Sequence, residues 1–171
     1  MSHLNRHNLF SSFQPAYRPG HSTETALLKV VNDLLLAMDK GKFSALVFLD
    51  LSVAFDTIDH GISLHCLHHV FGIQGTVLSW FRSYLTKRFH IVSTQSTNSD
   101  HYGLSFGVPQ GSVTEPTLFI LYTQPLISVI LKHPISYMLY ADETRVYKSF
   151  DLHDRLSSIL CVEKCVSNVK T

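Results

Sequence analysis

The sequence predicts an α+β protein in which a small antiparallel sheet is packed by helices. Three observations favour this fold class. Apolar residues recur at helical spacing in several segments, short apolar runs of strand length lie between them, and residues 135–148 alternate like a β-hairpin. With 171 residues, of which 45% are hydrophobic, the chain is long enough to bury one real core.

A helix and a strand are expected first. Ser22 or Thr23 can cap the helix, and Gly41 ends it. Its apolar residues have helical spacing: Leu27, Val30, Val31, Leu34, Leu35 and Met38. The next run, 43–51, is short and nearly continuously apolar, which predicts a buried strand with Asp50 at its carboxyl end.

The middle of the chain predicts four elements: helices at 61–71 and 76–87, then strands near 89–95 and 101–106. Gly72 and Gly75 separate the two helices. A loop at 107–112 leads into an apolar helix at 113–131, where Pro116 fits the first turn. This helix falls short of the roughly 20 residues that span a bilayer, so we expect it to be buried in the core.

The last two elements are a hairpin and a helix. We expect residues 135–148 to form an antiparallel hairpin with Asp142 and Glu143 at or next to its turn. Asp151 can cap a final helix, with Asp154 in the first turn. The expected inward-facing residues of this helix are Leu156, Ile159, Leu160 and Val166.

Composition limits the functional classes. The formal net charge of +1 is too small to indicate nucleic-acid binding by itself, and the 11 histidines show no convincing metal spacing. Cys66, Cys161 and Cys165 are an odd number without a CxxC motif, which favours reduced thiols inside the cell. The first ten residues lack the apolar run of a secretory signal.

Three acids lie at the ends of predicted strands: Asp50, Asp142 and Glu143. Carboxylates are the ligands that Mg²⁺ prefers, and two such ions can clamp the oxygens of a phosphoryl displacement. If Asp50 and Asp142 share these ions, their carboxylates should lie within about 8 Å of each other. The alternative is a solvated turn at residues 141–144, with Asp50 capping the segment that follows it.

Several segments, in their order and spacing, carry a resemblance to a known family. They are "FQPAYRPGHSTETALLKVVNDLLLAMDKGKFSALVFLDLSVAFDTIDH", "VLSWFRSYLTKR", "GVPQGSVTEPTLFILYTQPL" and "YADETRVYKSF". Over roughly residues 10–150 the chain resembles the reverse transcriptase domain of non-LTR (LINE-type) retrotransposons. The resemblance implies a polymerase palm-like sheet with partial fingers and no thumb, after an irregular segment at 1–9 and before a C-terminal helix at 151–171.

The implied activity is RNA-directed DNA polymerisation, in which deoxynucleotides are added to a primer 3′-OH by a two-metal mechanism. Two Mg²⁺ ions are the implied cofactors, with Mn²⁺ as an alternative. The implied partners are an RNA template, a DNA primer and deoxynucleoside triphosphates, with no membrane and no specified protein partner. The expected location is intracellular, without a distinction between nucleus and cytoplasm.

The resemblance assigns roles to particular residues. The implied catalytic and metal-binding acids are Asp50, Asp142 and Glu143. Phe55 matches the aromatic residue that crowds the sugar 2′ position. Gln110 matches a loop residue that lies beside the nucleotide and template, and Arg18 matches a fingers residue near the nucleotide. Phe55 could instead be a core aromatic and Gln110 a solvated loop residue. Three basic residues could contact phosphate or simply end a helix: Arg82, Lys87 and Arg88.

The sequence also departs from the family pattern. Glu143 replaces the second aspartate of the Tyr-x-Asp-Asp motif, and Thr114-Glu115 replaces an apolar residue followed by Gly or Ser. We expect Glu115 to repel nucleotide phosphates. Because no thumb is expected, a second hypothesis is that the chain is a truncated, catalytically inactive fragment derived from such an element. It would then be a relic, or a module for interaction or nucleic-acid binding. Whether this chain is an enzyme is therefore left open at the level of sequence.

Overall fold

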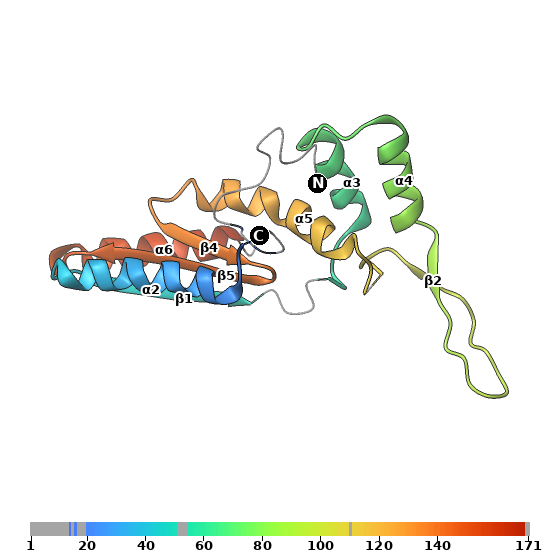
Figure 1. The fold of residues 1–171 in the computed structure, drawn as a ribbon, viewed down its shortest axis with the longest axis horizontal. Coiled ribbons are helices and arrows are strands. Elements are labelled where there is room, and N and C mark those ends of the chain that lie inside the picture. The colour runs from blue at the N-terminus through green and yellow to red at the C-terminus, as the bar shows by residue number, and fades with distance from the viewer. Residues whose placement is uncertain (1–13, 15, 17–19, 51–54, 110, 170–171) are drawn as a thin grey trace. The chain divides into compact units, whose positions relative to one another are not determined.

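A computed structural model of the chain describes residues 14, 16, 20–50, 55–109 and 111–169. These residues divide into two compact units (Figure 1). The first unit comprises Met1–Ser52 with Thr123–Thr171, and the second is Val53–Tyr122. Each unit is considered by itself below.

The first unit is built on a three-stranded antiparallel sheet in the order β1-β5-β4. Its strands are β1 at Phe43–Asp50, β4 at Ser136–Tyr140 and β5 at Glu143–Phe150. The register pairs Phe43 with Phe150 at one end and Asp50 with Glu143 at the other. β4 and β5 are joined at residues 141–142, so the predicted hairpin is confirmed, with Asp142 in its turn and Glu143 next to it.

Helix α2, at Thr23–Asp39, covers one face of this sheet. Its capping box is formed by Ser22 and Thr25, each of whose side chains accepts from the other's backbone N–H. Ala26 and Val30 are buried against β4 and β5. The helix predicted from the sequence is confirmed, but many of its large apolar residues are exposed: Leu27, Leu28, Val31, Leu35, Leu36 and Met38.

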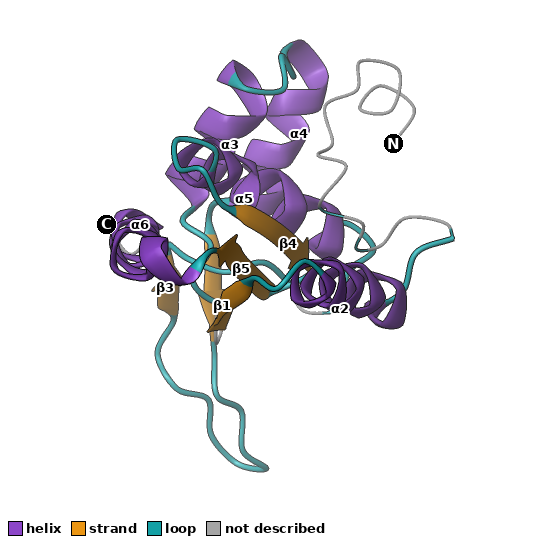
Figure 2. Ribbon diagram, turned by 90° about the vertical axis from the view of Figure 1, so that its left-hand side faces the viewer, coloured by secondary structure: helices purple, strands orange, loops and turns teal. Residues whose placement is uncertain are grey.

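The opposite face of the sheet packs against the end of α5, at Glu115–Ile130, and against α6, at Arg155–Val169. Figure 2 shows the strands between α2 and α6. The buried residues of this layer are Ile127, Ile130, Tyr137, Leu139, Val146 and Cys165. Side chains of a strand alternate between faces, so neighbouring residues of β4 and β5 contribute to different layers.

Two expectations about burial are wrong. β1 is an edge strand, paired with β5 alone among the described strands, and Phe43 and Phe48 are 53% and 63% exposed. In α6, Leu156 and Leu160 are exposed. A 3₁₀ turn at Leu152–Asp154 precedes α6, and the buried residues of the helix are Ser158, Val162 and Cys165.

The second unit holds the remaining elements: α3 at His60–His69, α4 at Gly75–Leu85, β2 at Arg88–His90 and β3 at Tyr102–Leu104. β2 and β3 form an antiparallel ribbon. The four predicted elements are thus present, with shorter strands than expected. Helix α4 ends before Lys87, which has a positive φ of 58°, so Lys87 and Arg88 do not belong to it.

Helix α5 begins in the second unit and ends in the first. Pro116 lies in its first turn, and its buried residues include Leu118, Phe119, Ile120 and Leu121. The prediction of a buried core helix is therefore confirmed. Within the described residues, no helix is both long and apolar enough to cross a membrane.

Candidate active site

The antiparallel pairing of β1 with β5 brings together acids that are far apart in the sequence. Asp50 is the last residue of β1 and lies directly opposite Glu143, the first residue of β5. Directly opposed residues project from the same face, with Cβ atoms about 4.5–5.5 Å apart. Asp142 precedes Glu143 in the hairpin turn. The three acids thus occupy one end of the sheet, whereas the distance between the carboxylates of Asp50 and Asp142 stays a prediction.

The turn that carries Asp142 has an unusual backbone. Ala141 has a φ of 51°, in the left-handed region that residues with a Cβ rarely adopt. The pairs Tyr140–Glu143 and Leu139–Thr144 continue the ladder up to this turn. Such strain costs on the order of 1 kcal/mol and persists where the surrounding structure fixes it. The hairpin therefore holds Asp142 in a defined position at the end of the sheet.

Glu143 has a cationic partner that the sequence reasoning missed. Its Oε2 accepts a hydrogen bond from Nη2 of Arg145, and the two form an ion pair. The Arg145 side chain is 6% exposed, whereas that of Glu143 is 51% exposed. Alternate residues of a strand share a face. The two-residue spacing of Glu143 and Arg145 was therefore the sequence signal that could have revealed this pair. Arg145 lies across the ladder from Phe48, with Cζ 5.9 Å from the ring centroid.

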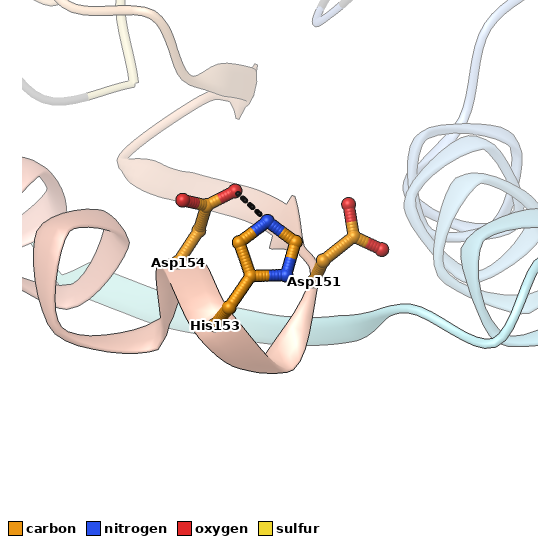
Figure 3. A group of neighbouring side chains, drawn as sticks. All are labelled: Asp151, His153 and Asp154. Atoms are coloured by element: carbon orange, nitrogen blue, oxygen red, sulfur yellow. Dashed lines mark ion pairs between the residues drawn. The ribbon is translucent and has the colours of Figure 1, made fainter.

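The chemistry of the acids fits a divalent cation. Asp50 and Asp142 offer hard carboxylate oxygens, which suit Mg²⁺ or Mn²⁺. Among the described residues, however, the only trio of donors within 4.8 Å of one another is Asp151, His153 and Asp154 (Figure 3). That trio follows the far end of β5.

A charged neighbour, Lys42, argues against a metal at this trio. His153 Nε2 lies 3.2 Å from Asp154 Oδ2, and Lys42 Nζ lies 3.6 Å from Asp151 Oδ2. A lysine ammonium beside the carboxylate competes with a cation for it. We therefore do not assign a metal site to these residues.

In the second unit, two segments expected near the nucleotide are joined to each other. Val108 N donates to Phe55 O at 3.1 Å, and Gly107 N donates to Ile58 O at 2.8 Å. The Phe55 ring packs on Phe119, with centroids 4.9 Å apart and planes tilted by 50°. The two hydrogen bonds join residues 55–58 to the start of the "GVPQGS" loop. Phe55 thus packs against another aromatic ring, as a core residue does. This contact does not test whether Phe55 also excludes a 2′-hydroxyl on the sugar.

Gly107 anchors the start of that loop. Its carbonyl accepts hydrogen bonds from His60 Nε2 at 2.7 Å and from Arg88 Nη1 at 3.0 Å. Its φ is 80°, and a Cβ there would lie 3.2 Å from the Asp56 carbonyl oxygen. Glycine is therefore required at this position. Arg88 thus donates to a backbone carbonyl and does not lie at the end of a helix.

Glu115 also has a local role. Its Oε2 accepts a hydrogen bond from Gly111 N at 2.6 Å, at the start of α5. A carboxylate is favourable at a helix N-terminus because it meets free N–H groups and the positive end of the dipole. This contact gives a structural reason for the departure at Glu115. Gln110 and Arg18, both expected at the nucleotide site, lie outside the described residues.

A helix-covered antiparallel sheet with acids at one end is the architecture expected of a polymerase palm. A family model described as "Reverse transcriptase (RNA-dependent DNA polymerase)" matches residues 1–170. The chain belongs to this family, which confirms the family resemblance of its motifs.

Two similar proteins come from mobile elements of Drosophila melanogaster. A probable RNA-directed DNA polymerase from transposon X-element is 33% identical over 152 residues, which covers 85% of this chain and 16% of the relative. The RNA-directed DNA polymerase from mobile element jockey is 31% identical over 139 residues, which covers 78% of this chain and 15% of the relative. The chain thus spans about one sixth of the length of these relatives.

A solved structure shares the fold. Apo telomerase from Candida tropicalis, truncated from its C-terminal domain, superposes with a TM-score of 0.61. The match covers 86% of this chain and 32% of the telomerase chain, at 15% sequence identity. At this identity the likeness shows the fold, which is mixed helix and antiparallel sheet of the palm-like kind.

Proposed function

We propose that the chain provides the palm of an RNA-directed DNA polymerase of a retrotransposon. The observation that carries this proposal is the β1–β5 register, which sets Asp50 against the Asp142–Glu143 turn. A polymerase needs carboxylates from separate motifs at one point, and this pairing supplies them on a rigid scaffold. The family membership supports the same activity.

Each residue has a role in this proposal. Asp50 and Asp142, with Glu143 beside them, are the residues that would hold the divalent ions. When bound, such ions stabilise charge on the attacking and leaving oxygens of phosphoryl transfer. Phe55 excludes a 2′-hydroxyl, while Gln110 and Arg18 contact the nucleotide and the template. The substrates are a primer 3′-OH, an RNA template and deoxynucleoside triphosphates.

Primer extension tests the proposal. The purified 171-residue chain is incubated with a labelled DNA primer on an RNA template. Mg²⁺ is high to supply the metal, and the salt concentration is low because weak nucleic-acid binding is strongest there. We expect addition of single complementary deoxynucleotides but no long products. Asp50→Asn serves as the blank. Synthesis that persists in Asp50→Asn, or no incorporation by the wild-type chain, would overturn the proposal.

Glu143→Asp is the informative variant in the same assay. It restores the aspartate of the family motif, yet we expect no gain in synthesis. The shorter side chain ends about 1.5 Å further from Arg145 and leaves that buried cation beside the acids. A large gain would show that the length of residue 143 alone limits the reaction.

A further inference from the structure

We infer that Arg145 is a positioning residue of the acid site, and that Glu143 serves as its counter-ion rather than as a metal ligand. The inference rests on the proposed function, because it divides the three acids of that site into two roles. Asp50 and Asp142 hold the metal, and the pair of Glu143 with Arg145 keeps the sheet beside them electrically neutral.

The burial of Arg145 is the first argument. Arginine is almost never fully buried without a partner, because desolvating its charge costs several kcal/mol. In the described part of the chain, Nε and Nη1 of Arg145 are buried without a hydrogen-bond partner, so Nη2 carries the one polar contact seen, to Glu143. The guanidinium also lies over the Phe48 ring. The stability of this cation therefore depends on the carboxylate of Glu143.

Geometry is the second argument. Glu143 and Arg145 project from the same face of β5, because they are alternate residues of one strand. Asp142 precedes the strand, in the turn. The Oε2 of Glu143 is paired with the guanidinium, and this positive charge beside the carboxylate disfavours a second cation on its other oxygen. In this inference, Asp50 and Asp142 supply the carboxylates that hold the metal.

The departure from the family motif is the third argument. Glutamate keeps the charge of the usual aspartate and reaches about 1.5 Å further. The extra methylene lets the carboxylate reach the arginine two positions later. The unusual acid and its buried cation therefore form one feature.

A thermal double-mutant cycle tests the pair without any catalytic readout. The variants are Glu143→Met, Arg145→Met and the double variant, since methionine is unbranched and similar in length. Glu143→Met leaves a buried unpaired cation and should lower the melting temperature by roughly 10 °C. Arg145→Met leaves a half-exposed carboxylate and should lower it less. The double variant should recover most of the loss, and additive losses would overturn the inference.

Titration with Mn²⁺ alone, followed by the electron paramagnetic resonance signal of the free ion, tests the metal roles. Glu143→Met should weaken binding and Arg145→Met should tighten it, because each changes the charge beside the site. The double variant should bind within about three-fold of wild type, while Asp142→Asn should lose at least about ten-fold. Arg145→Lys keeps the charge and should stay near wild type.

The outcomes separate the two proposals. If the double variant loses Mn²⁺ affinity as much as Asp142→Asn does, then Glu143 is a ligand and the inference fails while the proposed function stands. If Asp50→Asn and Asp142→Asn both bind Mn²⁺ like wild type, then the proposed metal site fails. The thermal cycle still decides whether Glu143 and Arg145 act as a pair.

Discussion

The hydroxyl of Tyr147, on β5, donates a hydrogen bond to the carboxylate of Asp33, on α2. Burial and the nearby Asp33 charge raise the pKa of Tyr147 well above its usual value. Burial also raises the pKa of Asp33, but the hydrogen bonds from Lys29 and Tyr147 outweigh it and hold that pKa below its usual value. This bond ties the helix to the face of the sheet that carries Glu143 and Arg145.

Removing the hydroxyl should therefore change how stability depends on pH. At pH 7, Tyr147→Phe should lower the free energy of unfolding by about 1–2 kcal/mol. Asp33 has a depressed pKa, so its contribution is present above pH 3.8 and is lost as the pH falls further. Tyr147 has a raised pKa, so its contribution is present below pH 10.0 and is lost as the pH rises through the folded-state value.

Urea unfolding from pH 3 to pH 11 measures this effect. The difference between wild type and Tyr147→Phe should shrink at both ends of the range. Tyr102→Phe is the control, because Tyr102 is 77% exposed and should show no such loss. A constant difference between wild type and Tyr147→Phe across the range would contradict the assignment.

The hairpin turn gives a second prediction. Ala141 has a positive φ, and a β-branched side chain tolerates this conformation poorly. Ala141→Val should lower the free energy of unfolding by about 1–2 kcal/mol, whereas Ala141→Gly should be neutral or slightly stabilising. Ala45→Val, in the edge strand β1, is the matched control and should be neutral. Equal effects at the two alanines would show that the turn is not strained.

Glu115 gives a third prediction. Glu115→Ala should lower the free energy of unfolding by about 1 kcal/mol, because Gly111 N loses its acceptor and the helix loses its N-terminal charge. Glu115→Gln keeps an acceptor and should lose about half as much. Thermal unfolding of the three proteins at low salt measures the series. Greater stability for Glu115→Ala would mean that the carboxylate is unfavourable where it lies.

Phe55 gives a fourth prediction, about sugar selection. If its ring excludes the 2′-hydroxyl, Phe55→Val should raise ribonucleotide incorporation relative to deoxynucleotide by at least about ten-fold. Single-nucleotide extension with matched triphosphates measures the ratio. Phe119→Leu removes the ring that packs on Phe55 and should leave the ratio nearly unchanged. An equal change in both variants would indicate a packing role alone.

Much of the fold could be predicted because the local signals agree with the final structure. The spacing of apolar residues and the cap at Ser22 predicted α2, and alternation around "ADET" predicted the hairpin. The exposure of Phe48 could not be predicted, because strand order decides which strand lies at the edge of a sheet. The buried face of α6 could not be predicted either, because helical spacing allows more than one apolar stripe and tertiary packing selects Ser158, Val162 and Cys165.

The site was predictable in part for similar reasons. The motifs identified Asp50 and Asp142, and the β1–β5 register then placed their strand ends together. Arg145 was missed, because a basic residue in a strand suggests solvent exposure until its burial is known. The local contact of Glu115 was missed because its acceptor role depends on the shape of the preceding loop.

The most direct test of the central claim is to map where a metal binds on the chain. Fe²⁺ is substituted for Mg²⁺ and, with ascorbate and peroxide, cuts the backbone next to its site; fragments are identified by mass spectrometry. Cuts beside Asp50 and Asp142 that excess Mg²⁺ suppresses and Asp142→Asn abolishes are the predicted result. Cuts confined to Asp151, His153 and Asp154 would contradict the account.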